Sequence, residues 1–192
     1  MSAPSVPFAL LALLSERPKY GLQLREEFEQ RTGEVWPLNV GQVYTTLQRL
    51  ERDRLVETFS QDDGSAQKGY RLTPDGRNAL TQWLSTPPDL SSPPRDELVI
   101  KVMVALHVPG IDVHDVIQVH RRYLVELMQQ WTRLKEDAGR ADLSFVLVVD
   151  AELYRLDSVV RWLDSADARL KRAAAEPPST QSTPLPKARL PR

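Results

Sequence analysis

The stretch that decides the fold is Asn39-Val-Gly-Gln-Val-Tyr-Thr-Thr-Leu-Gln-Arg-Leu-Glu-Arg-Asp-Arg-Leu55. Asn39 is a favourable helix cap, because its side-chain oxygen can accept a hydrogen bond from an amide of the first turn. Gln42 follows three residues later, and this spacing predicts a reciprocal bond back to the Asn39 amide, which is a capping box. We therefore expect a helix that begins near Val40.

This helix has two distinct faces. Val43, Leu47 and Leu50 share one side at about 100° per residue, which predicts that this side packs against a core. The opposite side carries amides, a hydroxyl and guanidinium groups, with an aromatic ring on its flank: Gln42, Thr45, Gln48, Arg49 and Arg52, with Tyr44 beside them. Such groups pair with base edges and phosphates in a major groove, so the pattern favours a DNA-reading helix. An ordinary amphipathic helix would show the same apolar stripe.

Two shorter helices precede this stretch. Residues Phe8–Leu14 form a short apolar helix pattern that is expected to lie in the core. The segment Tyr20–Arg31 gives a second amphipathic helix, with Gly33 as a C-terminal cap. Trp36–Leu38 then turns into the presented helix, which is the order that a helix-turn-helix requires.

An extended pattern follows Leu55. Val56–Ser60 and Lys68–Thr73 read as two strands joined by a turn over residues 61–66, and Thr73-Pro-Asp-Gly opens a returning helix. This order predicts a winged helix, whose hairpin places Lys68 and Arg71 beside the phosphate backbone. Purely structural roles for these two cations remain an alternative.

Three ordered blocks carry a family resemblance. They are Leu10–Leu24, Gly41–Val56 and Tyr70–Arg77. The third block reads Tyr-Arg-Leu-Thr-Pro-Asp-Gly-Arg. Together they resemble the PadR family of winged-helix transcriptional regulators over about residues 8–85. The resemblance implies that the helix at Gly41–Arg54 reads DNA, with Tyr44 near the backbone and the hairpin as a wing. One block departs from the family pattern His-Gly-Tyr-Glu-Leu, because this chain has Tyr-Gly-Leu-Gln-Leu.

Composition limits the alternatives. The chain has 192 residues and a net charge of −1, and residues 1–85 hold ten Lys and Arg against eleven Asp and Glu. No global basic field therefore indicates nucleic acid, and any DNA contact depends on local geometry. The absence of cysteine excludes disulfides and thiolate chemistry. No apolar run is long enough to cross a bilayer, so we expect a cytoplasmic protein without a membrane partner.

The chain divides at a proline-rich connector. Residues 1–86 form the predicted winged helix-turn-helix domain, and residues 87–94 form the connector. Residues 95–172 are predicted to be a helical dimerisation domain, and residues 173–192 a disordered tail. A solvated tail is the favoured interpretation of that last segment over a basic arm that touches DNA.

The helical region contains two heptad seams, over Asp112–Asp137 and Phe145–Lys171. His120 occupies a seam position, so we expect it to be buried and neutral. Pairing of the seams within one chain satisfies part of this pattern, and the family resemblance adds pairing between two subunits of a homodimer. The predicted dimer contacts are Ile117, Leu124, Leu127, Trp131, Leu134, Val149, Leu153, Leu156, Val160 and Leu163.

Catalytic and metal-binding patterns were not found in the sequence. The three histidines are His107, His114 and His120, and their spacing does not suit a metal site. No phosphate loop or nucleophile elbow occurs, so we expect neither an enzyme nor a cofactor. Trp131 and Trp162 fit a core better than a ligand slot. The family includes members that release DNA on binding aromatic or drug-like compounds, which leaves a small-molecule effector open.

The sequence therefore predicts a mainly α protein, with an N-terminal winged helix-turn-helix, a two-stranded wing and a C-terminal helical dimerisation domain. The predicted function is that of a homodimeric regulator, a repressor by resemblance, that binds a two-fold symmetric double-stranded DNA operator. The alternative is a helical interaction scaffold in which the winged helix docks a protein, and the near-neutral charge favours it.

Overall fold

The computed structural model describes residues 5–59, 68–88, 90, 95–138 and 143–175. The chain divides into two compact units, Met1–Asp89 and Leu90–Arg192. The predicted disordered tail over residues 173–192 is wrong at its start, because residues 173–175 are three alanines, strong helix formers, that continue the last helix to Ala175. Residues 176–192, the hairpin turn and most of the proline-rich connector lie outside the described residues.

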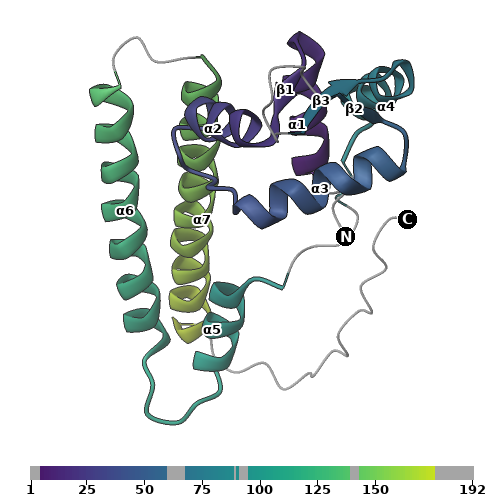
Figure 1. Ribbon diagram of the computed structural model, residues 1–192. Coiled ribbons are helices and arrows are strands. Elements are labelled where there is room, and N and C mark those ends of the chain that lie inside the picture. The colour runs from purple at the N-terminus through teal and green to yellow at the C-terminus, as the bar shows by residue number, and fades with distance from the viewer. Residues whose placement is uncertain (1–4, 60–67, 89, 91–94, 139–142, 176–192) are drawn as a thin grey trace. The chain divides into compact units, whose positions relative to one another are not determined.

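The first unit has the predicted winged helix-turn-helix fold (Figure 1). Its elements are α1 (Ser5–Glu16), β1 (Lys19–Tyr20), α2 (Gly21–Arg31), α3 (Val40–Arg52), β2 (Val56–Phe59), β3 (Gly69–Leu72) and α4 (Pro74–Ser85). The helix-turn-helix, the hairpin and the returning helix thus follow the predicted order.

The sheet contains one strand more than predicted. β2 and β3 pair antiparallel, with Val56 opposite Leu72 and Phe59 opposite Gly69, and they form the expected two-stranded wing. The additional strand, β1, pairs with β3 through Lys19 opposite Tyr70, which gives the order β1-β3-β2. A strand of two residues is too short to show an alternating pattern, so it could not be predicted from the sequence.

The core of this unit is built on the leucines of α1. All four helices and the sheet contribute side chains to it, and Phe8 stacks on Trp83 with ring centroids 4.9 Å apart. The buried members are Leu10, Leu11, Leu13, Leu14, Leu24, Leu38, Val43, Leu47, Leu50, Val56, Tyr70 and Leu80. The predicted packing stripe of α3 therefore lies in the centre of the unit.

The cap of α3 differs in one respect from the prediction. Asn39 Oδ1 accepts a hydrogen bond from the Gly41 amide at 2.8 Å, so the predicted cap is present. The return bond from Gln42 is absent among the described residues, and its side chain is exposed on the polar face instead. A return bond of this kind is found at α2, where the Tyr20 amide donates to Gln23 Oε1 at 3.0 Å.

A buried lysine joins three elements of the first unit. The Lys19 side chain is 1% exposed, and its ammonium donates to Glu16 Oε2 at 2.9 Å and to Glu27 Oε2. Arg31 also contacts Glu16, at 2.7 Å. These ion pairs bring the end of α1, strand β1 and α2 together. The sequence did not mark Lys19, because its burial depends on residues that are distant along the chain.

The described residues of the second unit form three helices (Figure 1). They are α5 (Glu97–Ala105), α6 (Val113–Asp137) and α7 (Leu143–Ala175). Asp96 caps α5 and Asp112 caps α6, each through a carboxylate oxygen 2.8 Å from an amide of the first turn. The helices α6 and α7 run side by side as a pair, with α5 packed against α6.

Much of the heptad pattern packs within one chain. Among the predicted dimer contacts, Leu127 and Trp131 are partly buried in the α5–α6–α7 core, and Leu153 is partly buried. Leu134 is exposed. Six others are buried within the chain itself: Ile117, Leu124, Val149, Leu156, Val160 and Leu163. Pairing within the chain, the first of the two alternatives, therefore accounts for these six side chains.

The expected burial of His120 is wrong. Its side chain is only partly buried and lines an open depression with Lys101, Tyr123 and Arg155. A seam position is buried only where a facing helix covers it, and at His120 an open depression lined by both charged and apolar side chains takes the place of such a cover. The histidine that does pair is His114, whose Nδ1 lies 2.6 Å from Asp167 Oδ1 on α7.

We expect Gly76→Ala to destabilise the first unit by about 2–4 kcal/mol. A Cβ atom at this position would lie 2.0 Å from the Leu55 carbonyl oxygen and 2.8 Å from Leu72 Cδ1. Gly→Ala in a helix normally stabilises by about 1 kcal/mol, so a loss of stability in Gly76→Ala would by itself indicate the close contact. Urea unfolding measures the change. Asn78→Ala, at an exposed position of α4, is the control, and equal stability of the two variants would contradict the close contact.

We expect Lys19→Met to destabilise the first unit by about 1–3 kcal/mol, since methionine keeps the buried stem but leaves two carboxylates without their shared cation. Hydrogen bonds from Arg31 and then from Lys19 lower the pKa of Glu16 from its usual 4.5 to about 2. A lowered folded pKa stabilises the protein above pH 4.5, and this contribution is lost as the pH falls toward 2.

The loss in Lys19→Met should therefore be smaller at pH 3 than at pH 7 when both are measured by urea unfolding. Arg17→Met removes a largely exposed contact to the same Glu27 carboxylate, and it should change stability by less than about 0.5 kcal/mol. A Lys19→Met loss that does not change with pH would show that packing, and not charge, is what the lysine supplies.

Candidate nucleic-acid interface

The polar face of α3 is open to solvent. Burial of Val43, Leu47 and Leu50, each at most 5% exposed, turns the opposite side of the helix outward. The six side chains predicted to contact DNA from this helix are all exposed: Gln42, Tyr44, Thr45, Gln48, Arg49 and Arg52. The face holds hydrogen-bond donors and acceptors suited to base edges, together with two guanidinium groups.

Tyr44 lies on the flank of α3 that faces α2. A Cβ atom at Gly21, the first residue of α2, would lie 2.8 Å from Cε1 of the Tyr44 ring. Only a glycine therefore lets the ring lie across the start of α2. The ring is 40% exposed, so its edge and hydroxyl remain available beside the polar face.

The other flank of α3 borders the first turn of α1. Gln42, Thr45 and Arg49 line an open cavity of about 510 Å³ together with the apolar side chains of Val6 and Phe8. Thus three of the predicted DNA contacts lie at the mouth of a depression and not on a flat helix surface. Arg49 makes no ion pair with any described residue, so its guanidinium is available to an external partner.

The wing is joined to α3 by a carboxylate that the sequence analysis did not single out. Glu51 accepts hydrogen bonds from Lys68 Nζ at 2.9 and 3.0 Å, and from Thr58 Oγ1 at 3.1 Å. Lys68 directly precedes β3, and its ammonium lies 5.9 Å from the centroid of the Tyr70 ring. The structure thus brings Lys68 next to the end of α3, as a DNA contact from the wing requires.

The remaining two predicted cations are also paired. Arg71 Nε donates to Glu57 Oε1 at 2.7 Å across the β2–β3 pair, so Arg71 is not brought to α3. Arg52 Nε donates to its neighbour Asp53 at 2.9 Å. The near-equal numbers of acidic and basic residues are the one feature of the sequence that is consistent with these pairs.

The pKa values of the paired groups reflect these contacts. The hydrogen bond from Lys68 lowers the pKa of the Glu51 carboxyl, and the hydrogen bond to Glu51 raises the pKa of Lys68. In the same way, the Asp53 carboxylate raises the pKa of Arg52. Both shifts at the Lys68–Glu51 pair favour the charged forms, so this contact is an ion pair at neutral pH.

The second unit presents apolar surface on α5. This helix buries only Val102 and Ala105, and most of its other apolar side chains are exposed. They are Val99, Ile100, Met103 and Val104, and Leu106, Val108 and Ile111 continue the surface beyond the helix end. Apolar patches of this kind mark interaction sites more often than ordinary surface.

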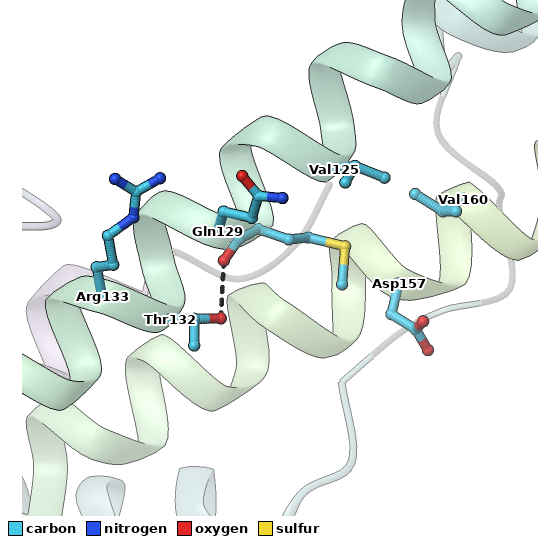
Figure 2. A pocket seen from close by; sticks show the side chains of 7 residues that line it. Val125, Gln129, Thr132, Arg133, Asp157 and Val160 are labelled. Atoms are coloured by element: carbon cyan, nitrogen blue, oxygen red, sulfur yellow. Dashed lines mark hydrogen bonds between the residues drawn. The ribbon is translucent and has the colours of Figure 1, made fainter.

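An open groove lies on the α6–α7 pair (Figure 2). Val125 and Met128 of α6 and Val160 of α7 form its apolar part, and Figure 2 shows the two valines pointing toward each other. The Thr132 hydroxyl donates to the Met128 carbonyl at 2.9 Å, so it is already satisfied within α6. The groove is therefore suited to apolar contacts.

The described part of the chain offers neither a cluster of metal ligands nor a membrane-spanning helix. No group of three or more His, Asp or Glu side chains in it could hold a metal ion. None of its helices is long and apolar enough to cross a membrane.

Sequence comparisons relate the chain to transcriptional regulators. The family model described as the transcriptional regulator PadR-like family matches residues 10–82. The chain is 24% identical to the negative transcriptional regulator PadR of Bacillus subtilis over 169 residues, which are 82% of this chain and 93% of that protein. It is 35% identical to the transcriptional regulator Rv3488 of Mycobacterium tuberculosis over 79 residues, covering 41% of this chain and 71% of that protein.

Structure comparisons extend the likeness to both units. The crystal structure of Bacillus subtilis PadR in complex with operator DNA has a TM-score of 0.65 at 21% identity, and covers 86% of this chain and 99% of that chain. The structure of the same protein with p-coumaric acid has a TM-score of 0.67 at 20% identity, and covers 88% and 99%. At these identities the likeness establishes the fold.

Proposed function

The chain belongs to the PadR-like family of DNA-binding transcriptional regulators, and we propose that it represses transcription as a homodimer on a two-fold symmetric operator. The negative regulatory role of the Bacillus subtilis relative supports repression. A mobility shift with the DNA upstream of its own gene, repeated at two salt concentrations, tests the DNA contact, because affinity carried by phosphate contacts falls steeply with salt.

The observation that carries this proposal is the exposed polar face of α3 beside the wing. Arg49 is unpaired among the described residues of that face, and Gln48 is fully open to solvent. Arginine pairs bidentately with guanine and glutamine with adenine, so this face can discriminate base pairs. Lys68 and Arg71 on the hairpin then contact phosphates, which fix the register of the helix without reading the sequence.

Dimerisation supplies the symmetry that the proposed operator requires. We propose that the exposed side chains of α5, together with the groove on the α6–α7 pair, form the contact between subunits. The six buried seam residues then act indirectly, since they hold α6 and α7 in the arrangement that presents this surface. Leu134, which is exposed, is the member of the predicted set that is most open to a partner.

Regulation by a small molecule is the third part of the proposal. The relative from Bacillus subtilis has been solved with p-coumaric acid, which supports an effector in this family. Titration of p-coumaric acid and related hydroxycinnamic acids into the protein–DNA complex tests release. Retention of the complex at saturating ligand, with unchanged tryptophan fluorescence, would show that these acids are not effectors of this protein.

The alternative function is a protein-interaction scaffold. The near-neutral charge of residues 1–85 favours it, because a DNA-binding surface is usually basic. A DNA-binding regulator requires the polar face of α3, and its affinity for DNA falls with salt. A protein-interaction scaffold has neither property as a requirement. A protein that shows no sequence preference among duplexes at either salt concentration would support the scaffold.

We expect Arg49→Ala to weaken operator binding by about 1–3 kcal/mol and to relax the preference at one base pair, because a bidentate contact to guanine would be lost. Arg77→Ala is the matched control, since it removes an equally exposed arginine of α4 that pairs with no described residue. Fluorescence anisotropy on the operator and on single-base variants measures both effects. Equal affinities of the two variants would show that Arg49 does not contact a base.

We expect Met103→Glu to weaken the dimer at least about tenfold, because an unpaired carboxylate in an apolar contact costs several kcal/mol. Gln130→Glu places the same charge at an exposed polar position of α6 and should leave the dimer intact. Analytical ultracentrifugation measures the dissociation constants, and thermal melts establish that both variants fold. A Met103→Glu variant that dimerises as tightly as the wild type would place the interface elsewhere.

A further inference from the structure

Each paired cation of the proposed DNA surface is held by a carboxylate of the protein itself. The ion pairs are Lys68–Glu51, Arg71–Glu57 and Arg52–Asp53, and their shortest nitrogen–oxygen distances are 2.7–2.9 Å. The near neutrality of residues 1–85 therefore reflects, in part, ion pairs at this surface. Three of the acidic residues of this unit each pair with one of these cations.

Glu51 differs from the other two carboxylates in its position. It lies on α3 itself, and it holds a cation of the wing that is 17 residues away along the chain. Its Oε1 atom accepts from both Lys68 and Thr58, and its Oε2 atom accepts from Lys68 alone. Arg52 pairs with its neighbour, and Arg71 pairs within the hairpin, so neither pair connects α3 to the wing.

The pair is also accessible to an external anion. The side chains of Lys68 and Glu51 are 50% and 33% exposed. Exposed ion pairs are weak, because water screens them and both side chains lose freedom in forming them. A phosphodiester presents the same kind of anionic oxygens as a carboxylate, so it can replace Glu51 at the Lys68 ammonium without rearrangement of the backbone.

We propose that Glu51 competes with the DNA backbone for Lys68, so that binding exchanges the Glu51 carboxylate for a phosphate at this ammonium. The inference rests on the proposed phosphate contact of the wing. After the exchange Glu51 keeps only the Thr58 hydroxyl, and its charge lies near the phosphate that has taken its place. Breaking the Lys68–Glu51 ion pair reduces the net free energy of binding, so Glu51 limits how tightly the protein binds DNA.

The test compares Glu51→Gln with Glu26→Gln on an operator selected from a pool of random duplexes. Glutamine keeps an oxygen that accepts from Thr58 but loses the charge that holds Lys68. Glu26 is exposed on α2 and pairs with no described residue, so its replacement makes the same change in net charge. Affinities are measured by anisotropy over a range of salt concentrations, and thermal melts check that each variant is folded.

We expect Glu51→Gln to bind about two- to fivefold more tightly than Glu26→Gln, which is the range of an exposed ion pair. The salt slope of Glu51→Gln should equal that of the wild type, because the number of phosphate contacts is the same in both. Lys68→Gln should flatten that slope by about 0.9, which is the effect of one lost phosphate contact. In the Lys68→Gln background, Glu51→Gln should then have no effect.

Two results would overturn the inference. An affinity of Glu51→Gln no higher than that of Glu26→Gln would show that Glu51 does not limit binding. A gain that persists in the Lys68→Gln background would assign the effect to simple repulsion of phosphate. Failure of the proposed function is distinguishable from both, since a wild-type protein that does not bind DNA would select no sequence from the pool.

Discussion

Burial of one stripe of α3 is the constraint on which the first unit depends. Val43, Leu47 and Leu50 pack into a core that is built on the leucines of α1 and completed by side chains of α2, α4, β2 and β3. Because these side chains share one side of a helix, fixing them in the core fixes the direction of every other residue of α3. The exposed polar face is thus a consequence of core packing, and its orientation is as stable as the core.

Close contacts around this core set the position of the wing. The backbone of Leu55, three residues after the end of α3, lies against Gly76 of α4, and its carbonyl also accepts a hydrogen bond from the Thr73 amide at 3.2 Å. The chain therefore leaves α3, forms the hairpin and returns to within contact of the point where it left. This closure explains why a glycine follows Thr-Pro-Asp in the block that begins α4, and it holds the hairpin beside the polar face.

Charge in this unit is organised by pairing and not by excess. Lys19 is buried among carboxylates and has a structural role, whereas Lys68 is exposed and is held at the surface by Glu51. A count of charges treats these two lysines alike, so it does not show which cation is exposed and able to contact an external anion. The neutral composition that favoured a scaffold is equally compatible with a DNA surface whose cations are paired until phosphate replaces the carboxylates.

The sequence by itself determined much of this protein. The order of elements, the Asn39 cap, the packing stripe and the exposed face of α3 all follow from residues within a few positions of one another, where helical and strand periodicities act. The three blocks of family resemblance rest on the same local patterns. These features could be predicted because each depends on spacing along the chain.

Only the tertiary structure decided which distant groups meet. Strand β1, the burial of Lys19, and the partners of Lys68 and Arg71 depend on residues that the fold brings together from elsewhere in the chain. The heptad seams show the same limit. Their spacing demanded a partner helix, but it could not tell α7 of the same chain from a helix of a second subunit, because both satisfy one apolar stripe equally well.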